Sequence, residues 1–334
     1  MNMYGFYRDT IKNGQYVTMN RKENYADWTA SIGGNYLIDQ RTAIYGNFTR
    51  AYRMPDYGAF TPLRKAQVDP TNAGYTKSIS NNEIVYNSEL GFRSGFGDFN
   101  FDVSAFYTFI DNRLATVYEG AVAVLRPLGN NDIRGAEISL SYAPQAVQGL
   151  SLSTSLTVQN AIFQSFLIPV RTIQSANPDS IFGLTLVNQQ TDGTKKPVYA
   201  IDLKGKQLPR VPSQIFNASA SYDSKYWGFD ASVNANMNIY NDATNLYKAN
   251  NITWINMGLY GRYPLPKGQS MRLSISVKNL LNTDYAERNV YSTSDDSALN
   301  QRQLVARGLD ASKVYYNGIP VMPRRFLVTL DYKF

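Results

Sequence analysis

The sequence predicts an all-β protein, a transmembrane antiparallel up-and-down β-barrel. Three observations predict it: apolar and polar residues alternate along many segments, these segments are long, and their connections are alternately short and long. Alternation with a period of two places each set of residues on its own face of a strand. The segments run to about 11–16 residues, against about 5–6 for a strand of a soluble sheet. That length suits a strand that crosses a bilayer at a tilt.

The strands are expected in a regular order along the chain. Residues 1–8 are interpreted as the tail of a strand, and a loop follows them. Short turns are predicted at 39–41, 95–98, 143–149, 223–226 and 264–268. Eleven full strands are predicted at 25–38, 42–53, 83–94, 99–112, 132–142, 150–163, 208–222, 227–240, 251–263, 269–278 and 321–334.

Longer connections separate these hairpins. Loops rich in Pro, Asn and Gly are expected at about 54–82, 164–207 and 282–320. The connection at about 113–131 is shorter, and residues 114–125 are apolar enough to hold some strand. Outer-membrane barrels have this asymmetry, with short periplasmic turns and longer extracellular loops.

The polarity of the two faces indicates lipid outside and water or a plug inside. In the strand at 227–240, Trp227, Phe229 and Val233 share one face, while Asp230 and Asn234 belong to the other. A soluble barrel of this size would need an apolar filling, whereas an aqueous or plugged lumen suits polar groups. Aromatic residues near strand ends are expected to form interfacial girdles, and the alternative is the ordinary preference of aromatics for strands. They are Trp28, Tyr52, Tyr107, Tyr222, Tyr226, Trp227, Tyr240, Trp254, Tyr263 and Tyr332.

Composition excludes several classes of function. The chain has no Cys and no His, which removes disulfides, thiolate metal sites, Cys nucleophiles and His general bases. We therefore expect no enzyme activity, no metal site and no cofactor. The net charge of +7 is spread along the chain, so no nucleic-acid partner is expected. The N-terminus lacks the apolar core of a signal peptide, from which a missing N-terminal part is expected.

Five segments resemble parts of a known family. VKNLLNTDYAERN (277–289) resembles a stretch near the end of TonB-dependent outer-membrane receptors, and AIYGNFTRAYRMPDYG (43–58) resembles an earlier one. YNSELGFRSG (86–95), IRGAEISLSY (133–142) and LPRVPSQIFNASASY (208–222) look like successive strand starts of the same barrel. The terminal Phe334 resembles the C-terminal aromatic that the barrel-assembly machinery reads.

The resemblance implies a barrel of about 22 strands closed by an N-terminal plug. Residues 1–334 would then be the C-terminal half of the barrel, with the plug and the early strands absent. It also implies a receptor in the outer membrane of a Gram-negative bacterium, in contact with membrane lipid. Such a receptor takes up a scarce large nutrient, and its energy comes from the TonB–ExbB–ExbD complex through the plug. A ferric siderophore is the first expectation, and an oligosaccharide or cobalamin remains open.

Ligand contact is expected at the long loops. Aromatic faces suit sugars or catecholate-type rings, and arginine suits anionic chelates. The alternative is that these side chains pack the loop or touch the plug. The loop after the strand at 42–53 and the two other long loops supply the candidates: Arg50, Arg53, Asp56, Tyr57, Phe60, Arg64, Arg171, Tyr199, Tyr291 and Arg302.

A second reading of the sequence is a passive pore. A smaller barrel of about twelve strands could close on itself, because an even strand count permits closure. The two readings differ in what precedes Met1: a plug and a TonB box for the receptor, or a signal peptide for the pore.

Overall fold

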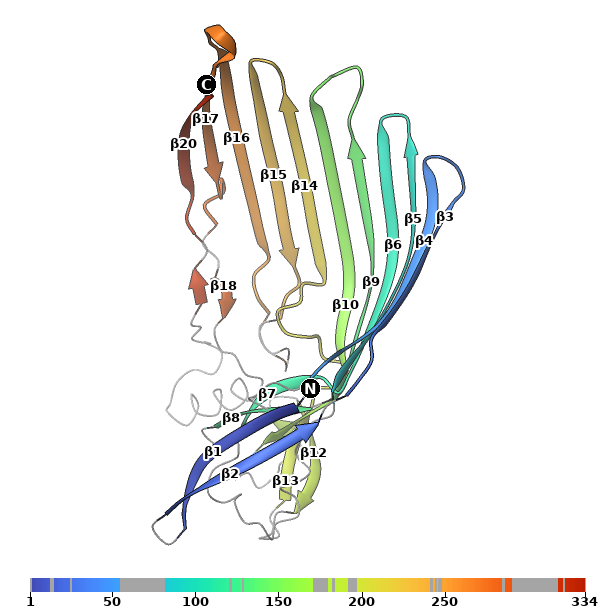
Figure 1. Ribbon diagram of the computed structural model, residues 1–334, viewed down its shortest axis with the longest axis vertical. Coiled ribbons are helices and arrows are strands. Elements are labelled where there is room, and N and C mark those ends of the chain that lie inside the picture. The colour runs from blue at the N-terminus through green and yellow to red at the C-terminus, as the bar shows by residue number, and fades with distance from the viewer. Residues whose placement is uncertain are drawn as a thin grey trace.

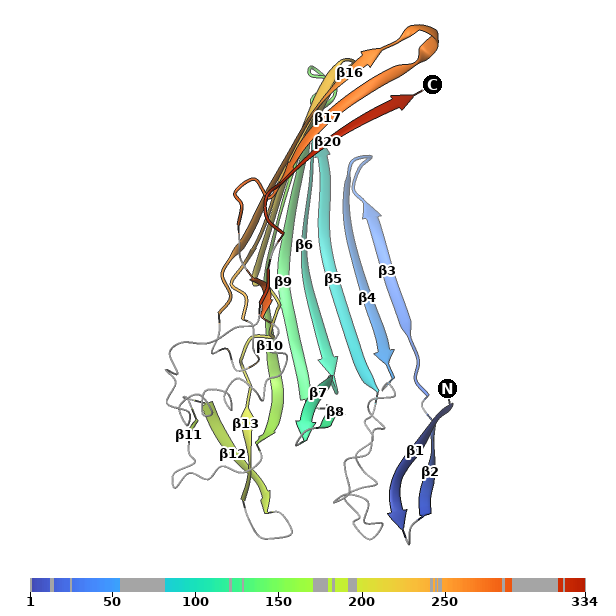
Figure 2. The same ribbon diagram turned by 90° about the vertical axis from the view of Figure 1, so that its left-hand side faces the viewer.

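The fold is a single large curved sheet (Figures 1 and 2). Eleven strands form its continuous path, each antiparallel to its neighbours, and β3 and β20 are the two edges. They confirm the eleven strands expected from the sequence. The computed structural model describes residues 2–12, 15–24, 26–54, 82–119, 122–127, 129–170, 180–181, 184–191, 197–240, 243, 245, 248–283, 286–289, 318–320 and 322–333.

Neighbouring strands of the path follow one another along the chain. Their bounds are β3 (Ala30–Leu37), β4 (Thr42–Arg53), β5 (Glu83–Phe96), β6 (Phe99–Asp111), β9 (Gly129–Tyr142), β10 (Leu150–Val170), β14 (Gln214–Asp223), β15 (Trp227–Met237), β16 (Ile252–Pro264), β17 (Ser270–Lys278) and β20 (Arg325–Lys333).

The two ends of the sheet differ in their connections. The short turns lie together at one end, here called the turn end, and the longer connections leave from the other, the loop end (Figure 1). At the turn end the Asp39 carboxylate accepts a hydrogen bond from the Arg41 amide at 2.7 Å. Gly97 has φ +56° between β5 and β6, a conformation that glycine adopts without steric cost. The expected alternation of short and long connections is therefore confirmed.

Additional hairpins extend from the loop end. The predicted loop after residue 8 is wrong, because β1 (Asn2–Lys12) pairs with β2 (Gln15–Asn24) in a two-stranded sheet. The strand expected within 114–125 is confirmed by β7 (Leu114–Glu119) and β8 (Val122–Pro127). The remaining short strands are β11 (Ser180–Ile181), β12 (Leu184–Thr191), β13 (Pro197–Asp202), β18 (Ala286–Asn289) and β19 (Gly318–Pro320).

Two strand limits differ from the prediction. β10 continues past Phe163 to Val170, where it pairs with β13. β14 begins at Gln214 rather than at residue 208, because Pro209 and Pro212 cannot donate to a strand ladder. Between these prolines, Arg210 has φ +63°, which lies outside the extended region.

One face of the sheet is apolar and exposed. In β20, Phe326, Val328 and Leu330 are 70%, 69% and 62% exposed, and they alternate with residues of the opposite face. The same outward face continues through Ile275 of β17 and Leu259 of β16, which are paired in register. A contiguous apolar surface of this extent needs an apolar environment. Among the described residues, no helix has the length and hydropathy to cross a membrane.

The aromatic residues expected in girdles fall mainly on this outward face. Tyr226, Trp227 and Tyr263 are exposed near the turn end, and Trp28 and Tyr107 are exposed toward the loop end. The prediction for Trp254 is wrong: it pairs with Asn234 on the inward, polar face of the sheet. The alternation of inward and outward residues along β16 determines the face to which Trp254 belongs. Its distance from the strand end does not.

The largest group of buried apolar side chains lies at the loop end of the sheet. The rings of Phe163 and Phe166 lie 4.5 Å apart on the extension of β10. Leu203 and Leu208 are almost fully buried, and their amides donate to β10 carbonyls at 2.9 and 2.8 Å. This small core joins the end of β10 to the segment that leads into β14.

Candidate functional site

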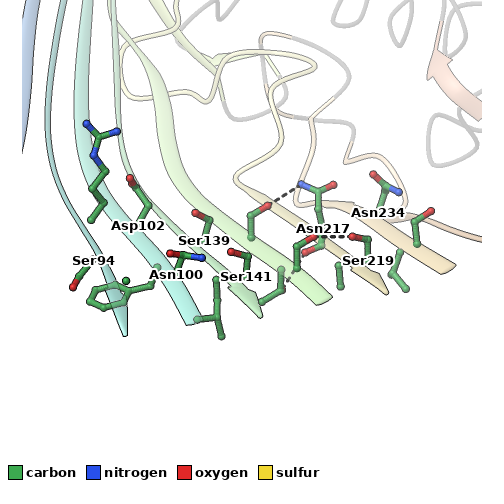
Figure 3. A pocket seen from close by; sticks show the side chains of 18 of the residues that line it. Ser94, Asn100, Asp102, Ser139, Ser141, Asn217, Ser219 and Asn234 are labelled. Atoms are coloured by element: carbon green, nitrogen blue, oxygen red, sulfur yellow. Dashed lines mark hydrogen bonds between the residues drawn. The ribbon is translucent and has the colours of Figure 1, made fainter. Parts of the chain in front are cut away.

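The concave face of the sheet carries a polar hollow of about 560 Å³. It extends across β5, β6, β9, β10, β14 and β15 near the turn end. Figure 3 shows Asp102, Ser139, Asn217 and Asn234 pointing to the same side of the sheet, from two strands on each side of β10. Its principal inward-facing side chains are Arg93, Asn100, Asp102, Ser139, Ser141, Ser153, Ser155, Asn217, Ser219, Ser232 and Asn234.

Hydroxyl and amide groups line the centre of the hollow. The Ser153 and Ser219 hydroxyls share a hydrogen bond of 2.7 Å, and the Asn217 amide donates to the Ser155 hydroxyl at 3.3 Å. These side chains are short and uncharged, so they leave space above the sheet and offer both donors and acceptors. The centre can therefore hold water or polar groups without a fixed charge preference.

A tyrosine bridges strands on one flank of the hollow. The Tyr45 hydroxyl donates to Asp102 at 2.8 Å, and the Arg93 guanidinium lies 5.2 Å from the Tyr45 ring. Arg93 also donates to the Asn35 side chain at 2.8 Å. The Tyr45 ring lies flat across Gly91, where an added Cβ would stand 2.1 Å from the ring. Glycine is thus required for the ring to cross the strand.

A second tyrosine is arranged in the same way on the other flank. The Tyr260 hydroxyl donates to Asp223 at 2.5 Å and lies over Gly228. Arg262 forms an ion pair with Asp223 at 3.1 Å, and the Arg272 guanidinium lies 3.7 Å from the centre of the Tyr260 ring. Charged side chains on both flanks are therefore already paired within the sheet.

The rim of the concave face at the loop end is ionic. Arg53 is paired in register with Glu83, a largely buried carboxylate at the start of β5. Arg113 contacts the fully buried Asn131, whose side-chain oxygen accepts from Nε at 3.2 Å. Burial lowers the pKa of the Arg113 guanidinium, while the charge of Glu83 raises it. Arg53 and Arg113 thus both lie near Glu83, at the points where the chain leaves β4 and β6.

Arg50 lies on the opposite, outward face. Its guanidinium forms an ion pair with Asp27 at 2.8 Å and lies 4.1 Å from the Trp28 ring. Asn82 donates to the other oxygen of Asp27 at 3.0 Å. These hydrogen bonds, that of Asn82 first, lower the pKa of Asp27. This cluster, the Arg50 clamp (Asp27, Trp28, Arg50, Asn82 and Tyr86), fastens the chain before β3 to the chain before β5.

The sequence matches the family model described as TonB dependent receptor-like, beta-barrel, over residues 4–280. The chain belongs to this family. The polar concave face and the apolar convex face are thus the inner and outer surfaces of a TonB-dependent receptor barrel wall. A comparison with curated proteins found no match.

Solved structures of TonB-dependent receptors share the fold. The ferric yersiniabactin uptake receptor FyuA from Yersinia pestis superposes with a TM-score of 0.63 at 16% identity, and 96% of this chain covers 40% of that one. The ferric preacinetobactin receptor BauA from Acinetobacter baumannii gives 0.58 at 14% identity, with 96% and 37% covered. The copper transporter OprC gives 0.54 at 14% identity, with 96% and 40% covered. The chain therefore spans well under half the length of these receptors.

Three of the ten predicted ligand-contact residues lie in the described part of the chain. Arg53 belongs to the inward rim, whereas Arg50 is held in the outward clamp. Tyr199 belongs to β13, opposite Val170 on the β10 extension. The other seven lie outside the described residues: Asp56, Tyr57, Phe60, Arg64, Arg171, Tyr291 and Arg302.

Sequence reasoning missed the partners of Arg53 and the two tyrosine clusters. Arg113 and Asn131 meet only because β6 and β9 are neighbours in the sheet. A signal for the tyrosines was present, since Tyr45 and Tyr260 are each followed across the sheet by glycine in register.

Proposed function

We propose that the chain is the C-terminal half of a receptor barrel that takes up a scarce large nutrient across the outer membrane of a Gram-negative bacterium. The family match over residues 4–280 carries this proposal. The plug domain and the early strands belong to a segment that precedes residues 1–334. This chain covers only 40% and 37% of the lengths of FyuA and BauA, which supports that arrangement.

The first substrate class that we propose is a ferric siderophore. Two of the structural neighbours are receptors for ferric yersiniabactin and ferric preacinetobactin. The copper transporter among the neighbours has the same fold, so the fold does not select the cargo. An oligosaccharide and cobalamin are the other candidates.

Ligand contact is proposed at the loop end of the concave face. Arg53 is exposed there, and after burial its positive charge is a further cause of the lowered pKa of Arg113. Two nearby guanidinium groups suit an anionic chelate. Asp56, Tyr57, Phe60 and Arg64 follow Arg53 directly in the chain and are proposed to extend the same surface. Arg171, Tyr199, Tyr291 and Arg302 are proposed as contributions from the other long connections.

Transport is proposed to draw its energy from the TonB–ExbB–ExbD complex, which would act on the plug. Phe334 is proposed to be the residue that the barrel-assembly machinery reads. The apolar convex face supports contact with outer-membrane lipid, since it resembles the outward apolar band of such barrels.

The test is growth of a strain that lacks the gene, under iron limitation, on a panel of iron complexes. Loss of growth on one ferric siderophore is expected, with rescue by the complete gene only in cells with an active TonB system. Growth defects on a glycan or on cobalamin would instead identify those substrates. Uptake that continues without TonB, or a signal peptide directly before Met1, would contradict the receptor and support the passive pore.

A further inference from the structure

The concave face of the sheet contains a column without charge. Every inward-facing residue of β10 from Ser151 to Gln159 is Ser, Thr or Gln. The inward residues of β14 next to them are uncharged as far as Asp223 at the end of the strand. We call this set the neutral strip: Ser151, Ser153, Ser155, Thr157, Gln159, Ile215, Asn217, Ser219 and Ser221.

Charged and bulky side chains lie on both sides of the neutral strip. On one side Arg93, Asp102 and Tyr45 form a paired cluster, and on the other side Asp223, Tyr260, Arg262 and Arg272 form a second. Within the described strands, the inward charges nearest the strip are those of Glu137, Asp223 and Asp230. The Glu137 carboxylate accepts a hydrogen bond from the Thr157 hydroxyl of the strip at 3.0 Å. The Asp230 carboxylate lies over Gly258 of β16, on the side away from the strip. The lining of the hollow of about 560 Å³ includes the middle of the neutral strip, with Arg93 and Asp102 at one edge.

The two kinds of surface hold a partner with different strength. A hydrogen bond to an ionised group is roughly twice as strong as one between neutral groups. Each neutral hydroxyl or amide contact contributes little, because water replaces it with a similar bond. The neutral strip therefore offers a domain inside the barrel only weak contacts, which water can replace.

We propose that the neutral strip on β10 and β14 lines the path along which the transported ligand passes through the barrel. This inference rests on the proposed receptor function and adds the place of passage. A path that has no fixed charge does not trap a charged chelate on its way. The hollow is also within the range of about 300–1,000 Å³ that small-molecule sites occupy.

Charge substitutions test the path in the complete receptor. Ser219→Lys places a cation in the neutral strip, and Ser274→Lys is the matched control on β17, which faces inward beside Arg272 but lies outside the strip. The probe is radioactive iron(III) bound to the siderophore that restores growth in the preceding test. Ser219→Lys is expected to slow uptake by about tenfold or more, the effect of about 1.4 kcal/mol on a barrier. Binding of the probe at the cell surface should stay unchanged, and the control should transport normally.

Modification after folding makes the test independent of assembly. The chain has no Cys, so Ser155→Cys and Ser274→Cys give single reactive sites. A cationic trimethylammonium thiosulfonate reagent is expected to block uptake through Ser155→Cys and to spare Ser274→Cys. Equal block at both sites, no block at Ser155→Cys after confirmed labelling, or no labelling there even in energised cells would overturn the path.

The outcomes separate this inference from the proposed function. If the probe binds and enters normally in every variant, the receptor function holds and the neutral strip is not the path. If the unmodified receptor neither binds nor imports any ferric complex of the panel, the proposed substrate class itself fails.

Discussion

Adjacent residues of β17 illustrate how differently the two faces of the sheet are built. Leu273 and Ile275 point outward and are 49% and 48% exposed, whereas Ser274 and Ser276, which alternate with them, point inward. The outward side chains depend on an apolar surrounding and make few specific contacts. The inward side chains depend on particular neighbours, as when the Tyr45 ring crosses Gly91. The stability of the barrel should therefore depend on the polarity of side chains on the outer face and on the size of side chains on the inner face.

The largest expected effect is that of a charge on the outer face. Ile275→Arg near the middle of β17 should destabilise the barrel in vesicles by about 2–4 kcal/mol, the cost of arginine facing lipid at the bilayer midplane. Ser274→Arg, one residue away and facing inward, should cost far less. Urea unfolding in phospholipid vesicles measures both, and equal losses would break the comparison.

A smaller effect is expected from a change of shape on the inner face. Gly91→Ala should displace the Tyr45 ring from Asp102 and cost about 1–3 kcal/mol, as is typical of overpacking. Gly261→Ala on the outer face has open space around its Cβ position and should change stability little. The same unfolding assay compares them, and a tolerated Gly91→Ala would show that the ring does not need this position.

The two arginines of β4 should separate stability from ligand binding. Arg50→Ala removes the partner of Asp27 and should lower the melting temperature in detergent by a few degrees, without changing affinity. Arg53→Ala should weaken binding of the siderophore complex and lower the melting temperature less than Arg50→Ala does, because Arg113 remains beside Glu83. If Arg50→Ala weakened binding and Arg53→Ala did not, the binding surface would instead lie on the outward face of the rim.

The smallest expected effect is the acid sensitivity of the Arg50 clamp. The Asn82 hydrogen bond, followed by those from the Trp28 amide and Arg50, lowers the pKa of Asp27 below its ordinary value of 3.8. A lowered pKa stabilises the folded state above pH 3.8, and this contribution is lost as the pH falls below that value. Melting curves of the native protein and of Asp27→Asn should therefore converge below that pH. A constant difference between the two proteins down to the lowest pH would contradict the clamp.

The alternation of apolar and polar residues predicted the strands that have lipid on one side. It did not predict the strands that lie beyond the lipid. All eleven sheet strands were predicted, because lipid and water impose a period of two on each. β1, β2 and the end of β10 lie past this region at the loop end, and their residues have no such pattern. The hairpin of β1 and β2 was therefore interpreted as a strand tail and a loop.

The candidate site was predicted less well than the fold. Arg50 and Arg53 were grouped as ligand contacts, although a separation of three residues places them on opposite faces of a strand. Their partners could not be predicted, because Asp27, Asn82 and Arg113 come near them only through the pairing of distant strands. Composition indicated a polar interior, while the neutral strip required the register of β10 and β14.

The direct test of the assignment of the two faces is the quenching of fluorophores along β17 by brominated lipid. Since the chain has no Cys, single cysteines at positions 271–277 can each carry a fluorophore in vesicles of brominated phospholipid. Strong quenching is expected at Met271, Leu273, Ile275 and Val277, and weak quenching at Arg272, Ser274 and Ser276. Quenching without a period of two, or strongest at the serine positions, would contradict the assignment of the apolar face to lipid.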